Sequence, residues 1–177
     1  MAFEEVKNQI LKPYTDINGT TYYPDIFYDG GVRQDVNAPR KGGRKHNGVD
    51  FNYRDANGNR APFINDSHPF VDSPVKGKIT DVNNNWGIVE ITDANGNRHR
   101  ICHLDSWNVK KGDIVEAGQT IGQMGGRGDQ NGDGIYGANE YLPHIDYKIL
   151  GPKGQYIDPE TYWLFPYQLF FLIMKNL

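Results

Sequence analysis

The sequence predicts a mainly β protein: an antiparallel β-sandwich or partly closed barrel, with short helices at its ends. Between residues 70 and 125, short apolar runs are separated by glycine and asparagine turns, which is the pattern of an all-β sandwich or barrel. Glycine accounts for 21 of the 177 residues and suits many tight connections. This length is that of one domain with a sizeable core.

Within this region the expected elements follow one another closely. Short strands are expected at residues 74–79, 87–91, 98–104 and within 109–122. The Asn95-Gly96 pair supplies the positive-φ positions of a hairpin turn. The strand at 98–104 alternates and carries His103.

The remainder of the chain is assigned to the same domain. A covering segment, a central core and a C-terminal apolar segment are expected at residues 1–42, 43–159 and 160–177. Asp158 is expected to cap a short helix that has Pro159 at its first position. The apolar run that follows is too short to cross a bilayer and contains Pro166. We therefore expect no membrane span, and expect this run to pack on the domain or to dock a partner.

Composition excludes several functional classes. The formal net charge is −3 and there is no long basic run, so a nucleic-acid surface is not expected. The single cysteine, Cys102, has no partner for an internal disulfide. The first residues are acidic and lack an apolar run, so the sequence shows no signal peptide.

A histidine and an aspartate are spaced to share a metal ion. His46 precedes Asp50 by four residues, and Asp146 is placed to be a third ligand. Catalytic zinc takes three protein ligands from His, Asp or Glu and keeps one position open. His103 and His144 then remain as groups that handle protons around the metal.

The motifs around these residues follow a recognisable order. After the His-x-x-x-Asp segment come Ser-Pro-Val-x-Gly-x-Ile, His-Leu, Gly-Gln-x-Ile-Gly, Pro-His-x-x-Tyr-x-Ile and a closing Asp-Pro. In this order they resemble the lysostaphin-type zinc endopeptidases, which cleave the peptide stems and cross-bridges of bacterial peptidoglycan. The resemblance runs from about Gly43 to Pro159.

The resemblance implies roles by position. His46 and Asp50 become zinc ligands, and His103 becomes a catalytic histidine. The family closes its site with His-x-His, in which the first histidine is catalytic and the second is a ligand. Here the first is His144, but the second position holds Asp146.

Aspartate is a legitimate zinc ligand, but it changes the charge of the site. A second carboxylate cancels the formal positive charge left by the first, activates water less, and favours harder metals such as manganese. Three readings follow: an active zinc enzyme with a His-Asp-Asp set, an inert pseudo-peptidase that binds or regulates, and an enzyme with its third ligand elsewhere. His68 and His99 are the candidates for that third reading.

A second metal motif lies between the Gly-Gln-x-Ile-Gly hairpin and His144. It matches the calcium loop D-x-[DN]-x-[DN]-G-x(5)-E at every specified position. The expected ligands are Asp129, Asn131, Asp133, the carbonyl of Ile135, and Glu140. A structural calcium ion would order the strand that carries His144.

Other features give weaker indications. The 109–122 stretch resembles a lipoyl or biotinyl carrier hairpin, but no lysine occupies the modified position. Tyr22 and Tyr23 belong to an aromatic-rich segment that either lines a substrate groove or joins the core. The resemblance implies action on peptidoglycan in the periplasm or cell wall. A phage, an injection machine or a longer protein would deliver the domain, and a delivery or immunity protein is a possible partner.

Overall fold

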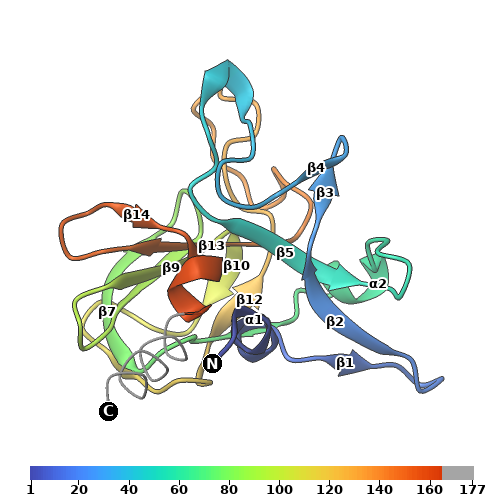
Figure 1. The fold of residues 1–177 in the computed structure, drawn as a ribbon, viewed down its shortest axis with the longest axis horizontal. Coiled ribbons are helices and arrows are strands. Elements are labelled where there is room, and N and C mark those ends of the chain that lie inside the picture. The colour runs from blue at the N-terminus through green and yellow to red at the C-terminus, as the bar shows by residue number, and fades with distance from the viewer. Residues whose placement is uncertain (165–177) are drawn as a thin grey trace, which may run out of the picture.

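The computed structural model describes residues 1–164 and shows a mainly β architecture in which all pairs of named strands are antiparallel (Figure 1). The largest sheet has nine strands, ordered β1-β2-β5-β13-β9-β8-β7-β11, with β14 also paired to β13. Their bounds are β1 Tyr14–Thr15, β2 Thr21–Ile26, β5 Val49–Arg54, β7 Gly77–Asn83, β8 Ile88–Thr92, β9 Arg98–Cys102, β11 Ile114–Val115, β13 Ile145–Leu150 and β14 Tyr156–Ile157. The mainly β prediction is confirmed.

Smaller elements complete the fold. A three-stranded sheet is ordered β10-β12-β6, and β3 and β4 form a separate hairpin. The bounds are β10 Leu104–Trp107, β12 Thr120–Met124, β6 Phe70–Asp72, β3 Tyr28–Asp29 and β4 Val32–Arg33. The helices are α1 Phe3–Ile10, α2 Pro62–Asn65 and the 3-10 turn η1 Lys41–Gly43.

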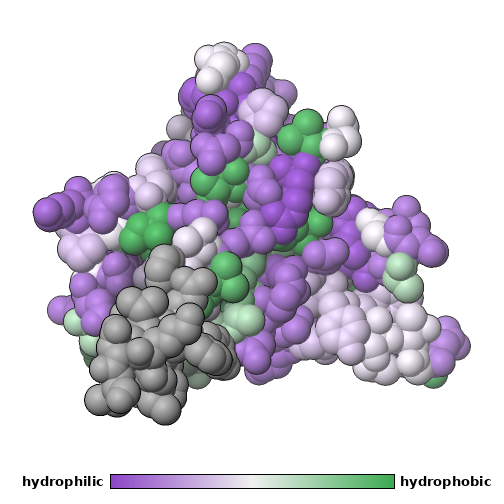
Figure 2. Space-filling view, in the orientation of Figure 1, coloured by the Kyte–Doolittle hydropathy of each residue, from purple (hydrophilic) through white to green (hydrophobic). Residues whose placement is uncertain are grey.

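The core is built from apolar side chains of both larger sheets and of α1. Helix α1 buries Phe3, Val6 and Ile10, whose spacing puts them on one helical face. Strand β13 adds Tyr147, which is fully buried and stacks on Phe3 with ring centroids 6.3 Å apart. The face seen in Figure 2 is mostly hydrophilic, with small hydrophobic groups near its centre.

The expected hairpin at 93–97 is confirmed. The Asp93 amide donates to the Asn97 carbonyl at 2.9 Å. Of the expected Asn95-Gly96 pair, Gly96 takes a positive φ, +79°, and Asn95 does not. The strand expected at 98–104 is wrong in one respect: β9 ends at Cys102, and a new strand starts at Leu104. Between them His103 adopts a φ of +67°, a left-handed conformation that interrupts the strand.

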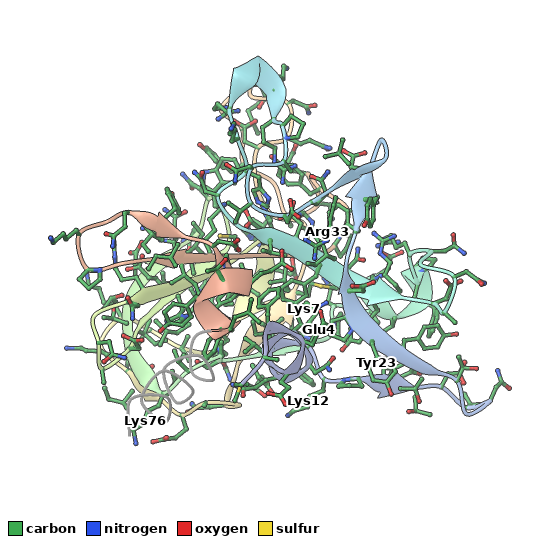
Figure 3. All side chains as sticks on the ribbon, in the orientation of Figure 1. Glu4, Lys7, Lys12, Tyr23, Arg33 and Lys76 are labelled. Atoms are coloured by element: carbon green, nitrogen blue, oxygen red, sulfur yellow. The ribbon has the colours of Figure 1, made fainter. Side chains whose placement is uncertain are left out.

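Residues before His46 extend the main sheet. Strand β2 pairs with β5, aligning Ile26 with Phe51. Buried Lys7 on α1 forms ion pairs with Glu4 and Asp25 at 3.0 and 3.3 Å (Figure 3). These contacts attach the N-terminal segment to the face and edge of the sheet.

The chain end that the structure describes is helical from Pro159. The Asp158 side chain accepts from the Glu160 amide at 2.9 Å, so the predicted cap is confirmed. Glu160 in turn receives two hydrogen bonds from Arg33, at 2.7 and 2.8 Å. The rest of the predicted apolar segment, 165–177, lies outside the described residues. Among residues 1–164, no helix has the length and hydropathy to cross a membrane.

Candidate metal centre

Two adjacent strands bring two carboxylates together. Asp50 on β5 and Asp146 on β13 are directly paired in the register of the main sheet. His46 approaches from the segment before β5, and Gly48 lies between it and Asp50. A Cβ at Gly48 would overlap Asp146 Oδ1, so this position needs glycine for the aspartate to reach the site.

The ligand atoms converge on one point. Within residues 1–164, one group of histidine and carboxylate side chains offers atoms that all lie within 4.8 Å of one another: His46, Asp50 and Asp146. His46 Nε2 lies 3.2 Å from Oδ1 of each aspartate. All three side chains are buried. The predicted His-Asp-Asp set is therefore assembled and could hold a metal ion.

Two further observations show that this set suits a metal ion. Asp50 Oδ1 is buried and accepts no hydrogen bond, although a buried polar atom normally has a partner. Its other oxygen, Oδ2, accepts from Arg40 Nη2 at 2.6 Å. Asp146 is arranged alike, because Lys148 Nζ binds its Oδ2 and leaves Oδ1 facing His46. One nitrogen and two oxygens are donors that zinc accepts.

Charge at the site is strongly paired. Burial by itself would lower the pKa of His46, but the hydrogen bond with Asp146 and the negative charges of Asp146 and Asp50 raise it to about 9. Burial acts to raise the pKa of Asp146, but Lys148 and His46 hold it well below its usual range. The two carboxylates thus favour a positive charge at the point between them.

Two more histidines lie beside this group. His103 Nε2 is 3.9 Å from Asp146 Oδ2, and the His103 and His144 rings are 4.6 Å apart. Each ring places Nδ1 against a backbone carbonyl: His103 on Arg127 and His144 on Leu142, both at 2.7 Å. A carbonyl only accepts, so Nδ1 carries the proton in each ring and Nε2 is left as an acceptor.

The environment of His103 keeps this ring neutral. Burial, reinforced by His144, lowers the pKa of His103 to about 4. Aromatic rings surround both histidines: Tyr141 is 4.9 Å from His103, and Phe27 is 5.5 Å from His144, between ring centroids. A neutral imidazole with a free Nε2 is in the protonation state that a general base requires.

The other candidate residues lie elsewhere. His68 Nδ1 bonds to the Met124 carbonyl at 2.9 Å, and buried His99 bonds to the Tyr147 hydroxyl at 2.7 Å. Neither belongs to the group of ligand atoms. Tyr22 packs edge-on against Phe63, with ring centroids 4.9 Å apart. Tyr23 is 54% exposed on β2 (Figure 3). A groove role for either tyrosine stays a prediction.

The 129–140 loop is exposed for most of its length. Asp129 Oδ1 accepts from the amides of Gly132 and Asp133, at 2.7 and 3.1 Å, and its Oδ2 accepts from Gly134 at 3.0 Å. Asp133 Oδ1 accepts from the Ile135 amide at 2.8 Å. These carboxylates stabilise turns, and they are not part of the convergent group described above. Calcium binding stays a prediction.

Sequence reasoning missed the cations that hold the two aspartates. Neither Arg40 nor Lys148 is among the site residues that the sequence predicts. A signal for Lys148 was present: it follows Asp146 by two residues in one strand, which puts both side chains on the same face. Nothing in the sequence shows that Arg40 reaches Asp50 ten residues away.

Comparisons with known proteins identify a family and several similar structures. A model of the family described as "Peptidase family M23" matches residues 44–159. The catalytic domain of the antimicrobial peptidase lysostaphin from Staphylococcus simulans is 23% identical, with a TM-score of 0.52, over 80% of this chain and 92% of that one. A mutant catalytic domain of the prophage-encoded M23 protein EnpA from Enterococcus faecalis is 25% identical, with a TM-score of 0.51, over 77% of this chain and 96% of that one.

A more distant likeness has the same fold. A zinc containing peptidase from Vibrio cholerae is 23% identical, with a TM-score of 0.50, over 84% of this chain and 45% of that one. No curated protein sequence matches the chain.

Proposed function

Because the chain belongs to peptidase family M23, we propose that it is a metal-dependent endopeptidase that hydrolyses peptide bonds in peptidoglycan stems or cross-bridges. The observation that carries the proposal is the convergence of His46 Nε2 with Oδ1 of Asp50 and Asp146, beside two histidines with free Nε2 atoms. The likeness to EnpA and to the lysostaphin catalytic domain supports the substrate class.

Zinc is the metal we propose for His46, Asp50 and Asp146. When bound, it supplies a Lewis acid that polarises the scissile carbonyl and makes water a better nucleophile. Arg40 and Lys148 hold the outer oxygens of the two aspartates, so each aspartate presents one oxygen to the ion.

We assign the proton acceptor to His103. Its buried ring has a pKa of about 4 and is therefore neutral near pH 7, and the Arg127 carbonyl directs Nε2 towards Asp146. His144 stacks beside it, with the Leu142 carbonyl fixing its Nδ1–H. The role we propose for His144 is to stabilise the oxyanion that develops on the scissile carbonyl.

Digestion of purified sacculi tests the proposal, with the released muropeptides identified by mass spectrometry. Wild type, His103→Ala and Asp146→His are each assayed after chelation and refilling with zinc or manganese. We expect new peptide termini from zinc-loaded wild type and none from His103→Ala. Sacculi left intact by wild type in both metals would contradict the endopeptidase function.

An inert wall-binding module is the second candidate, because Asp146 replaces the family's histidine ligand. Cleavage by Asp146→His, alone or combined with Lys148→Met, with none by wild type would establish this alternative. Binding to sacculi that survives in His103→Ala would support it as well.

We also propose that the 129–140 loop binds one calcium ion through Asp129, Asn131, Asp133, Ile135 and Glu140. The complete motif match supports this. The loop is also connected to the site: Tyr141 donates to the Asp129 carbonyl at 3.2 Å and packs on His103. Ordering of the loop by calcium would therefore also restrict the position of the His103 ring.

The substrate places the action of this domain at the bacterial cell wall. We propose delivery by a phage, by an injection machine or as part of a longer protein. The likeness to a prophage-encoded protein supports the first of these routes.

A further inference from the structure

A lysine is paired with the aspartate that departs from the family pattern. Lys148 Nζ binds Asp146 Oδ2, and the two side chains are 22% and 6% exposed. Asp146 Oδ1 lies on the other side of the carboxylate, 3.2 Å from His46 Nε2. The two oxygens of Asp146 therefore have different partners.

This arrangement limits how Asp146 can bind a metal ion. A carboxylate can coordinate through one oxygen or through both. With Lys148 on Oδ2, Oδ1 is the oxygen that remains for the ion. A histidine also coordinates through a single atom, so the paired aspartate provides the same number of donors as the residue it replaces.

The charges compensate as well. Replacing a neutral histidine by an aspartate adds one negative charge beside the metal, and Lys148 adds one positive charge to the same carboxylate. Arg40 pairs with Asp50 whichever residue occupies position 146, and so does not enter this difference.

The absence of a side chain at Gly48 leaves space for the aliphatic part of Lys148. Lys148 lies against Gly48, where a Cβ would come within 2.7 Å of both Lys148 Cγ and the Tyr147 carbonyl oxygen. The glycine between the first two ligands thus leaves room for the lysine as well as for Asp146.

We propose that Lys148 is a positioning residue that makes Asp146 equivalent to a neutral ligand with one donor atom, so that positions 146 and 148 act as one unit. This inference rests on the proposed metal site, and it extends to which residues set its affinity for zinc. It requires that a histidine at position 146 works well only when the lysine is removed too.

Four proteins test the proposal: wild type, Lys148→Met, Asp146→His and the double variant, each freed of metal. Zinc affinity is measured by competition with a chromophoric chelator, and circular dichroism confirms that each protein folds. Lys76→Met is the matched control, because Lys76 is an exposed lysine paired with Glu116 at 2.7 Å, outside the site (Figure 3).

Asp146→His alone leaves the charge of Lys148 unpaired beside the ion. We expect the double variant to bind zinc at least about tenfold more tightly than Asp146→His, the usual size of effects from groups that contact ligands. In the wild-type background Lys148→Met removes the repulsion between the lysine and the metal ion, but it also removes the ion pair that positions Asp146 Oδ2. The two effects oppose each other, so the change in zinc affinity is smaller. In cobalt-loaded protein, Lys148→Met weakens the visible absorption as Asp146 binds through both oxygens.

Equal zinc affinities for Asp146→His and the double variant would overturn the proposal. A gain of the same size from Lys148→Met in both backgrounds would also overturn it, because the lysine would then act on the ion directly. The expected affinities combined with intact sacculi would instead contradict the endopeptidase function and leave the pairing of the two positions supported.

Discussion

The site around Asp146 and the 129–140 loop both match a metal-binding pattern in sequence, but they differ in structure. At the site, each aspartate has one oxygen held by a cation and the other directed at His46, and the Oδ1 atom of Asp50 is buried without a hydrogen bond. In the loop, both oxygens of Asp129 accept from backbone amides. The comparison teaches that a ligand pattern becomes a prepared site when other residues hold its donor atoms in place and leave them free.

Removing zinc is the most severe test of this difference. Chelation is expected to reduce cleavage of sacculi by at least roughly a thousandfold, because a Lewis acid contributes several kcal/mol to such a reaction. Zinc should restore activity, whereas calcium added alone should not. Restoration by calcium alone would mean that the loop, and not the buried group, holds the essential ion.

His103→Ala separates chemistry from metal binding. Loss of a general base is expected to lower kcat by about two to four orders of magnitude, with zinc content unchanged, because His103 is not one of the three convergent residues. Peptide release and zinc per protein are measured on the same preparation. A loss of zinc in parallel with activity would show that His103 is a ligand.

Gly48→Ala tests how closely the prepared site is packed. The added methyl group would overlap Asp146 Oδ1 and approach Lys148, so zinc affinity should fall roughly ten- to a hundredfold. The control is Gly132→Ala in the loop, where a Cβ meets nothing within 4 Å but φ is +74°. It should leave zinc affinity unchanged. Equal losses of zinc affinity in Gly48→Ala and Gly132→Ala would show that the site around Asp146 is no more closely packed for zinc than the 129–140 loop.

Calcium should produce the smallest effect, on stability and not on chemistry. At about a hundred times its Kd, a ligand adds about 2.7 kcal/mol to the free energy of unfolding, or roughly 5 to 10 °C in Tm for a domain of this size. Differential scanning calorimetry with and without calcium measures the shift, and Glu140→Gln is expected to remove most of it. An unchanged Tm in wild type would show that the loop matches the motif by composition alone.

The sequence predicted the parts of this molecule that depend on local pattern. The turn residues Asn95 and Gly96 identified a hairpin, and Gly96 takes the positive φ that few other residues accept. The three convergent residues were found because their spacing and order match a family. Asp158 as a helix cap followed from the chemistry of its side chain.

What could not be predicted depends on contacts between distant segments. Arg40 is ten residues from Asp50 in the chain, and only the folded path of that segment puts their side chains 2.6 Å apart. The break at His103 was not predicted because the run of residues 98–104 is short and largely buried and resembles one strand, while the backbone changes conformation at that one residue. The sequence puts Lys148 on the same strand face as Asp146, but a shared face does not determine that the ammonium group pairs with the outer oxygen of the carboxylate.

The left-handed backbone of His103 has a consequence for how this molecule evolves. A residue with a Cβ is strained at a φ of +67°, at a cost of order 1 kcal/mol or more, whereas glycine takes this conformation freely. His103→Gly would relieve this strain, but it would also remove a buried ring that packs on Tyr141 and His144 and donates to the Arg127 carbonyl. A cavity of this size and the loss of a buried hydrogen bond together cost more than about 1 kcal/mol, so glycine offers no net gain in stability. The packing around the ring therefore compensates for the strained backbone, and a mutation to glycine at this position would be opposed by stability as well as by any role of the ring.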